Sequence, residues 1–212
     1  MKTLKTFATM AAMLLCCVIV NAQTLVDGIY YSLNSSSATA TVTYGSTKYS
    51  GDIVIPETIT YGENVYTVTV IGTSAFNNCY NLKSITIPKT VTSIGSSAFS
   101  GCSALSSVYI SSLEAWCNIP FSKYDNSNPL SYAENLYLNG NLVTDLEIPN
   151  TVTKIKDYAF KDFDYFTSVT IPESVTSIGE EAFNSVGCEV KFLSSTPATL
   201  ASTSCFSSNA VL

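Results

Sequence analysis

Apolar side chains recur along the chain at a fixed interval. Four segments end in an alanine–phenylalanine pair, and their phenylalanines are Phe76, Phe99, Phe160 and Phe183. The first two are 23 positions apart, as are the last two, and a further 23 positions lead to Phe206. Self-similarity at such an interval is typical of repeat proteins, in which no unit buries its apolar face alone and stacked copies share one core.

Each repeat also predicts one short strand. Nine and eleven positions after the phenylalanine, two apolar residues flank a polar one, as in Ile85-Thr86-Ile87. This alternation is typical of a strand with one buried face, and strands of successive repeats would pair as a parallel ladder about 4.8 Å apart. Proline has no amide hydrogen to donate, so Pro88, Pro149 and Pro172 would end such strands. The sequence therefore predicts a mostly β, right-handed repeat solenoid.

Two stretches are longer than this interval allows. The second and third phenylalanines are 61 positions apart, which is one regular interval plus a longer one, and this places an inserted longer unit around residues 111–148. In it, Ser112 is expected to cap a short helix, and Asn139-Gly140 is a strong signal for a hairpin turn. Another hairpin is expected around Tyr61-Gly62-Glu63-Asn64.

The start of the chain, residues 1–22, has the layout of a cleavable secretory signal. Lys2 and Lys5 precede an apolar run from residue 7 to residue 20, and cleavage is expected after Ala22. The run is shorter than the ~20 residues needed to cross a bilayer, so no membrane span is expected in the mature chain. Cys16 and Cys17 leave attachment of a lipid as a minor alternative.

The rest of the chain is expected to form two parts. Residues 23–52 would make an N-terminal β cap from two strand-like segments, residues 29–33 and 40–44, on either side of a polar loop. Residues 53–212 would make the solenoid. Because the last repeat stops without a polar capping unit, further repeats or an anchor are expected beyond Leu212.

Composition narrows the function classes. The chain has no histidine, and all ten of its basic residues are lysine. It therefore lacks the groups of Ser-His-Asp and Cys-His relays, of His-based zinc sites and of bidentate phosphate clamps. The net charge of −6 becomes −8 once the two lysines of the signal are removed, which disfavours nucleic acid as a partner. We predict no enzyme activity, no catalytic or metal-binding residues and no cofactor.

One acidic stretch has both a chemical and a structural interpretation. Asp157, Asp162 and Asp164 could resemble the paired carboxylates of glycoside hydrolysis. They alternate, however, with aromatic residues at core positions such as Phe160 and Phe163. We interpret the three carboxylates as a solvated face.

The five cysteines that follow the signal are an odd number, which argues against a complete disulfide framework. Cys79 and Cys102 occupy the same repeat position and are expected to be buried free thiols, which behave as small hydrophobic groups. Cys188 and Cys205 lie off this position, and a disulfide between them is left open.

The repeated Ile-Gly-x-x-Ala-Phe, followed by Cys, Leu and Ile-x-Ile-Pro at fixed offsets, resembles the BspA-like leucine-rich-repeat proteins of bacterial surfaces. The resemblance covers about residues 53–206. The chain departs from the pattern where Lys156 replaces the glycine, Phe163 the cysteine, Ser111 the proline and Glu189 an apolar residue. These departures affect local geometry and not the array.

The resemblance implies a secreted or cell-surface protein that binds extracellular or host proteins and has no catalytic role. Binding is expected through the strand face or the loops of residues 111–145, without assignment to individual residues. Two rival functions use the same scaffold. One is a carbohydrate-binding module in which exposed tyrosines and Trp116 stack on glycan rings, and the other is a structural spacer that holds a further domain away from the cell.

Overall fold

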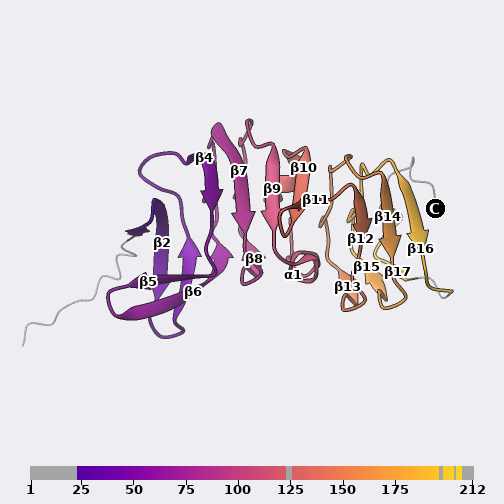
Figure 1. Cartoon of the computed structure of the whole chain (residues 1–212), viewed down its shortest axis with the longest axis horizontal. Coiled ribbons are helices and arrows are strands. Elements are labelled where there is room, and N and C mark those ends of the chain that lie inside the picture. Colours follow the sequence, from indigo (N-terminus) through magenta and orange to yellow (C-terminus); the bar gives the residue numbers. More distant parts are fainter. Residues whose placement is uncertain (1–22, 123–125, 196–197, 203, 207–212) are drawn as a thin grey trace, which may run out of the picture.

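The protein is an elongated stack of coils in a computed structural model that describes residues 23–122, 126–195, 198–202 and 204–206 (Figure 1). Successive coils contribute parallel strands to a first ladder, which is interrupted once. Its earlier part contains β4 (Ser50–Val54), β7 (Asn81–Ile87), β9 (Ser107–Ile110), β10 (Asn135–Leu138) and the antiparallel β11 (Asn141–Leu142). Its later part contains β12 (Asp145–Glu147), β14 (Ser168–Ile171) and β16 (Glu189–Phe192).

A second ladder is built from shorter strands of the same coils, and it is also interrupted. Its earlier part contains β3 (Thr39–Val42), β6 (Asn64–Ile71) and β8 (Ser93–Ile94). Its later part contains β13 (Lys154–Ile155), β15 (Ser177–Ile178) and β17 (Thr199–Leu200). The strands expected from the apolar alternation are thereby confirmed, and the chain folds as the predicted mostly β repeat array.

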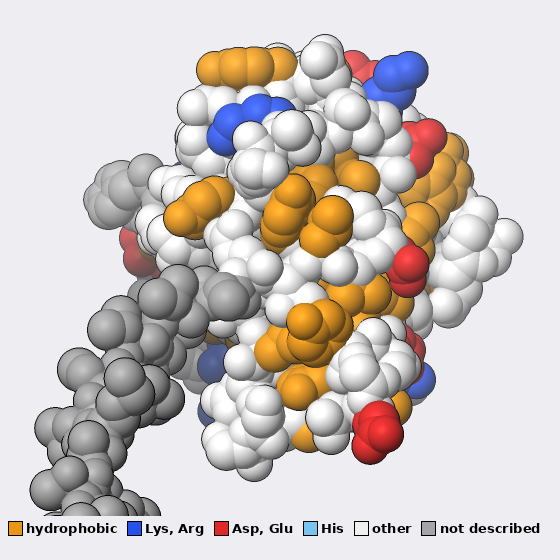
Figure 2. Space-filling model, turned by 90° about the vertical axis from the view of Figure 1, so that its left-hand side faces the viewer, with side chains coloured by type: hydrophobic (Ala, Val, Ile, Leu, Met, Phe, Trp, Pro, Cys, Tyr) orange, Lys and Arg blue, Asp and Glu red, His pale blue; other side chains and the backbone are white. Residues whose placement is uncertain are grey.

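Antiparallel strands form the N-terminal end. β1 (Thr24–Val26), β2 (Ile29–Asn34) and β3 pair in order, and β3 then pairs in parallel with β6, so these strands continue into the second ladder. β5 (Thr58–Tyr61) makes the expected hairpin with β6. Figure 2 shows hydrophobic side chains spread over this end of the molecule, and Leu25, Tyr61 and Val65 are among the exposed ones.

Equivalent phenylalanines stack on one another through the interior. The ring centroids of Phe76 and Phe99 are 5.1 Å apart, and those of Phe160 and Phe183 are 5.2 Å apart. Phe206 continues the stack at 5.3 Å from Phe183. The ring planes within each pair differ by 12° or less, so one coil repeats the geometry of the next. All five rings belong to one continuous cluster of buried side chains.

The close spacing of the coils leaves no room at the glycine of the repeat. A Cβ atom on Gly95 would lie 2.5 Å from the backbone nitrogen of Thr73 in the preceding coil. At the equivalent Lys156, the preceding segment is different, because the Lys156 amide donates to the carbonyl of Cys117 at the end of a helix. A side chain is tolerated there because no regular coil precedes it.

The inserted unit interrupts both ladders. β10 pairs with β11 through the predicted hairpin, whose turn residues Asn139 and Gly140 have φ of 50° and 83°, and β11 does not pair with β12. Between the two halves of the second ladder lies the predicted short helix α1 (Leu113–Cys117), capped by the Ser112 hydroxyl, which accepts from the Ala115 amide at 3.1 Å.

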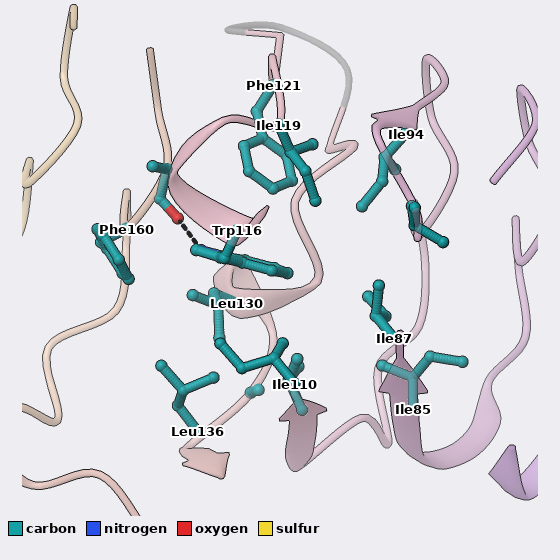
Figure 3. Close-up of a cluster of buried hydrophobic side chains, with 14 of the residues drawn as sticks. Ile85, Ile87, Ile94, Ile110, Trp116, Ile119, Phe121, Leu130, Leu136 and Phe160 are labelled. Atoms are coloured by element: carbon teal, nitrogen blue, oxygen red, sulfur yellow. Dashed lines mark hydrogen bonds between the residues drawn. The ribbon is translucent and has the colours of Figure 1, made fainter. Parts of the chain in front are cut away.

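Trp116 fills the core where the ladders stop. Its side chain is 1% exposed, and its Nε1 donates to the Ala159 carbonyl at 2.9 Å. Figure 3 shows the ring lying among Ile119, Phe121 and Leu130, the last of which comes from the 3₁₀ turn η1 (Pro129–Ser131). Asn128, which caps η1, donates to the Tyr158 carbonyl at 2.8 Å. The insertion therefore joins the two halves through side-chain hydrogen bonds and the backbone hydrogen bond from Lys156 to Cys117, and not through strand pairing.

We expect Phe183→Ala to lower the free energy of unfolding by about 3–5 kcal/mol, because Phe183 stacks on rings in both neighbouring coils. Chemical denaturation followed by circular dichroism measures this change. Tyr80→Ala is the control, since Tyr80 is 59% exposed and should lose little stability. Equal losses in the two variants would contradict the stacked core.

Candidate binding surface

The outward face of the first ladder carries two rows of side chains in register. Buried residues such as Ile85, Val108 and Leu136 point inward, so the residues on either side of them point outward. One row, the polar row, consists of Asp52, Ser84, Ser107 and Asn135. The other, the apolar row, consists of Val54, Thr86, Tyr109 and Tyr137, with Leu142 of β11 opposite Tyr137.

The two tyrosines of the apolar row stand on edge. Their ring centroids are 4.4 Å apart and their planes differ by 9°. Rings lying flat beside each other on the sheet would overlap at this separation, so the faces of Tyr109 and Tyr137 must be turned toward each other. Ring edges and hydroxyls are left to meet a partner. Val54 and Leu142 at the ends of the row are 65% and 49% exposed.

Beyond the interruption, the same outward positions become charged. Glu147, Thr170 and Lys191 continue the position of the apolar row on β12, β14 and β16. Asp145 takes the position of the polar row, and its carboxylate accepts hydrogen bonds from Ser168 at 2.6 Å and Thr167 at 2.7 Å. These donors hold the pKa of the Asp145 carboxyl below its usual range, so it is ionised at neutral pH.

A groove opens at the interruption. It has a volume of about 360 Å³ and is called here the junction groove, with lining residues Leu113, Leu138, Asn139, Asn141, Leu142, Val143, Asp145 and Glu147. Other open depressions lie beside α1, around Lys89 and Glu114, and along the second ladder, around Lys154 and Asp157. Of these surfaces, only the junction groove includes a residue of the apolar row, Leu142.

Comparison with known proteins assigns the family. Residues 57–142 and 132–212 match the model of the BspA type Leucine rich repeat region, in six copies. The chain belongs to the BspA-type leucine-rich-repeat family. No curated protein matches its sequence.

Solved structures of bacterial leucine-rich-repeat proteins are similar to this BspA-type chain. A Bacteroides ovatus protein is 30% identical with a TM-score of 0.53, over 79% of this chain and 40% of its own length. A cell surface protein of Faecalibacterium prausnitzii is 24% identical with a TM-score of 0.43, over 83% of this chain and 56% of its own. The Treponema pallidum leucine-rich-repeat protein is 23% identical with a TM-score of 0.47, over 80% and 85%. The chain thus spans well under two thirds of the first two proteins.

The acidic stretch of this BspA-type chain ties one coil to the next. Asp157 accepts from the Glu180 amide at 2.8 Å, Asp162 from the Ser185 hydroxyl at 3.1 Å and Asp164 from the Gly187 amide at 2.9 Å. The three carboxylates are exposed, which confirms that they form a solvated face. Among residues 23–206 as far as they are described, no three His, Cys, Asp or Glu side chains are grouped to hold a metal ion.

The expected role of Trp116 as a stacking platform is wrong. The indole is buried in the core and its nitrogen is bonded to Ala159, so no ring face meets solvent. Tyr44, Tyr80 and Tyr165 are more than half exposed, as expected for some of the tyrosines. The apolar row itself was missed, although Thr86 and Tyr109 stand at the outward position of the strand alternation that the sequence shows.

The cysteines are structural. Cys79 and Cys102 are buried and free, as predicted, and the Cys102 thiol donates to the Phe76 carbonyl at 3.2 Å. Burial raises the pKa of Cys102 and of Cys117 to about 12. Cys188 and Cys205 are both free thiols, which contradicts the disulfide left open between them.

The signal sequence, residues 1–22, lies outside the described residues. Within the part of the chain that is described, no helix is long and apolar enough to cross a membrane. The segments beyond Phe206 are likewise outside the description, so the expected continuation past Leu212 stays a prediction.

We expect iodoacetamide at pH 8 to alkylate Cys188 first in the folded chain of residues 23–212. Cys188 is half-buried, whereas Cys79, Cys102, Cys117 and Cys205 are buried and would react only on unfolding. Burial also raises the pKa of Cys188, so its reaction should be slower than that of a free cysteine. Mass spectrometry of the peptides measures the order, with the denatured chain as control. Alkylation of Cys102 or Cys117 as fast as Cys188 would show that the core is not closed.

Proposed function

We propose that this BspA-type protein is exported to the cell surface or secreted, and that it binds extracellular or host proteins without catalysis. The apolar row carries the proposal. Val54, Thr86, Tyr109 and Tyr137 align on neighbouring strands and end beside Leu142, which gives a rigid apolar strip rimmed by the polar row. Such a strip, apolar at its centre and polar at its margin, is the usual anatomy of a protein interface.

Export is supported by the sequence rather than by the fold. Residues 1–22 combine lysines, an apolar run and a small residue before the expected cleavage position. The resemblance to bacterial surface proteins agrees with that direction. In this proposal, the role of residues 1–22 is to direct residues 23–212 out of the cytoplasm.

Ring orientation favours protein over glycan as the partner. Stacking on a sugar requires an exposed aromatic face, but one face of Tyr109 and one face of Tyr137 cover each other at 4.4 Å, and their outer sides are flanked in the row by Thr86 and Leu142. Trp116 is buried. The ring edges and outward hydroxyls instead offer apolar contact area and hydrogen-bonding groups, which suit contact with a partner's side chains and backbone. Tyrosine supplies large contact area with little rotamer entropy to lose, which suits it to a protein interface.

The test is binding of the purified chain, residues 23–212, to a panel of immobilised extracellular-matrix proteins, measured by surface plasmon resonance beside a glycan array. For any protein of the panel that binds, Tyr109→Ser and Tyr137→Ser should each weaken the affinity about tenfold, because each removes a central ring of the strip. Circular dichroism of each variant verifies the fold.

Tyr165→Ser is the matched control, because Tyr165 is 51% exposed on the other half of the molecule. It should bind like the unchanged chain. The proposal fails if no protein of the panel binds, if glycans bind instead, or if the two row variants bind as well as the control.

A further inference from the structure

The junction groove has an apolar wall and an acidic margin. Leu142 of β11 is the exposed part of this wall, while Leu138 and Val143 are half-buried against the core and line the groove together with the buried Leu113 of α1. Figure 1 shows β11 and β12 on either side of the interruption, and both strands contribute residues that line the groove. The wall is therefore continuous with the apolar row through Leu142, which lies opposite Tyr137.

The acidic margin comes from β12. Leu146 is fully buried, so Asp145 and Glu147, its neighbours on either side, point outward together. Neither carboxylate takes part in an ion pair in the described segments, where the pairs found are Lys89 with Glu57 and Lys161 with Glu181. The groove therefore presents two carboxylates that no described lysine neutralises.

Positive charge is distant along this face. Lys191 shares the row of Glu147, but Thr170 of β14 stands between them. Strands are about 4.8 Å apart, so two strand steps separate Lys191 from Glu147 by roughly 10 Å, which is beyond direct contact. The hydroxyls of Ser168 and Thr167 meanwhile stabilise the ionised form of Asp145. The local field of the groove is negative, in a chain with a net charge of −6.

We infer that the junction groove binds a lysine or arginine side chain of the protein partner. The apolar stem of that side chain would lie along the exposed Leu142, and its charged head would reach Glu147 and Asp145. Long basic side chains combine an apolar stem with a charged head, which matches this wall and margin. Arginine is the better fit, because its planar guanidinium donates to a carboxylate through two parallel hydrogen bonds.

The inference rests on the proposed function, and it specifies the partner. A segment that binds this face would place apolar side chains on the apolar row and a basic residue beyond Leu142, beside β12. Neutral or acidic segments would leave Glu147 and Asp145 without compensation at the edge of the interface.

A pair of short peptides tests the groove by itself. The first is acetyl-Ala-Leu-Arg-Leu-Ala-amide, and the second replaces arginine by citrulline, which has nearly the same shape and no charge. Each peptide is titrated into the ¹⁵N-labelled chain of residues 23–212, and binding is followed by NMR. The arginine peptide should shift the amide signals of Asn139, Asn141 and Val143. The citrulline peptide should bind the groove with about tenfold lower affinity. Raising the salt concentration should weaken the arginine peptide alone.

Glu147→Gln should weaken the arginine peptide about threefold, as expected for one exposed carboxylate, and should leave the citrulline peptide unchanged. Glu63→Gln is the matched control, since Glu63 lies in the turn between β5 and β6 and should change neither. Equal binding of the two peptides, shifts confined to other residues, or an arginine affinity indifferent to Glu147→Gln would each overturn the inference.

Tyr109→Ser separates the two ideas. It should weaken binding to the matrix protein about tenfold and leave the affinity of the arginine peptide for the groove unchanged. If a matrix protein binds through the apolar row with an affinity that ignores Glu147→Gln, the proposed function stands and the cation site fails. If the arginine peptide binds as described while no matrix protein binds, the groove stands and the wider function fails.

Discussion

The structure depends on the stacking of one coil on the next. A single coil presents a strand, an alanine and a phenylalanine on its inner side and has nothing of its own to bury them against. The stack supplies both the apolar contact and the hydrogen bonds: the Phe76 amide donates to the Ala98 carbonyl of the next coil at 2.8 Å, and the Phe160 amide does the same to Ala182 at 2.8 Å. Because contact and hydrogen bond arise at the same position, a coil is ordered only when its neighbour is in place.

The stack also stabilises backbone conformations that a coil would avoid alone. Two residues before each of four phenylalanines, the chain adopts positive φ at Ser74, Ser97, Tyr158 and Glu181, with φ of 56°, 54°, 60° and 49°. Left-handed conformations of this kind cost roughly 1–2 kcal/mol for residues other than glycine. The turn before the phenylalanine is kept because the stacked rings and the bonds between coils outweigh that cost in each of these four repeats.

The periodic part of the fold could be predicted from the sequence because its cause is local and repeated. The regular spacing of the phenylalanines, the strand around Ile85 and the serine cap of α1 each follow from an interval or from one side chain. The position of the interruption could be predicted from the spacing, but its structure could not. The sequence does not show that Trp116 is buried, because its hydrogen-bond acceptor, Ala159, lies 43 positions later. Long-range partners of this kind leave no spacing signal.

The apolar row shows a different reason for the limits of sequence reasoning. Its residues occupy the outward position of successive strands, and the alternation alone identifies that position. What the alternation does not give is the register, which brings Tyr109 within stacking distance of Tyr137 although the two belong to units of unequal length. Only the paired strands show that the longer unit still delivers its tyrosine to the same row.

The interruption also changes the character of the face. In an uninterrupted array, strands that carry equivalent positions are paired side by side. Here Tyr137 and Glu147 occupy equivalent positions of their strands, but the strands are separated by the interruption. Ladder hydrogen bonds between β10 and β12 are given up, and Trp116 and Asn128 hold the halves together from inside. The edges of β11 and β12 are therefore not paired with each other at the point where the apolar and acidic surfaces meet. A partner that must satisfy both is more narrowly specified than one that meets a uniform strand face, because a wrong charge leaves Glu147 uncompensated and a wrong shape leaves Leu142 in water.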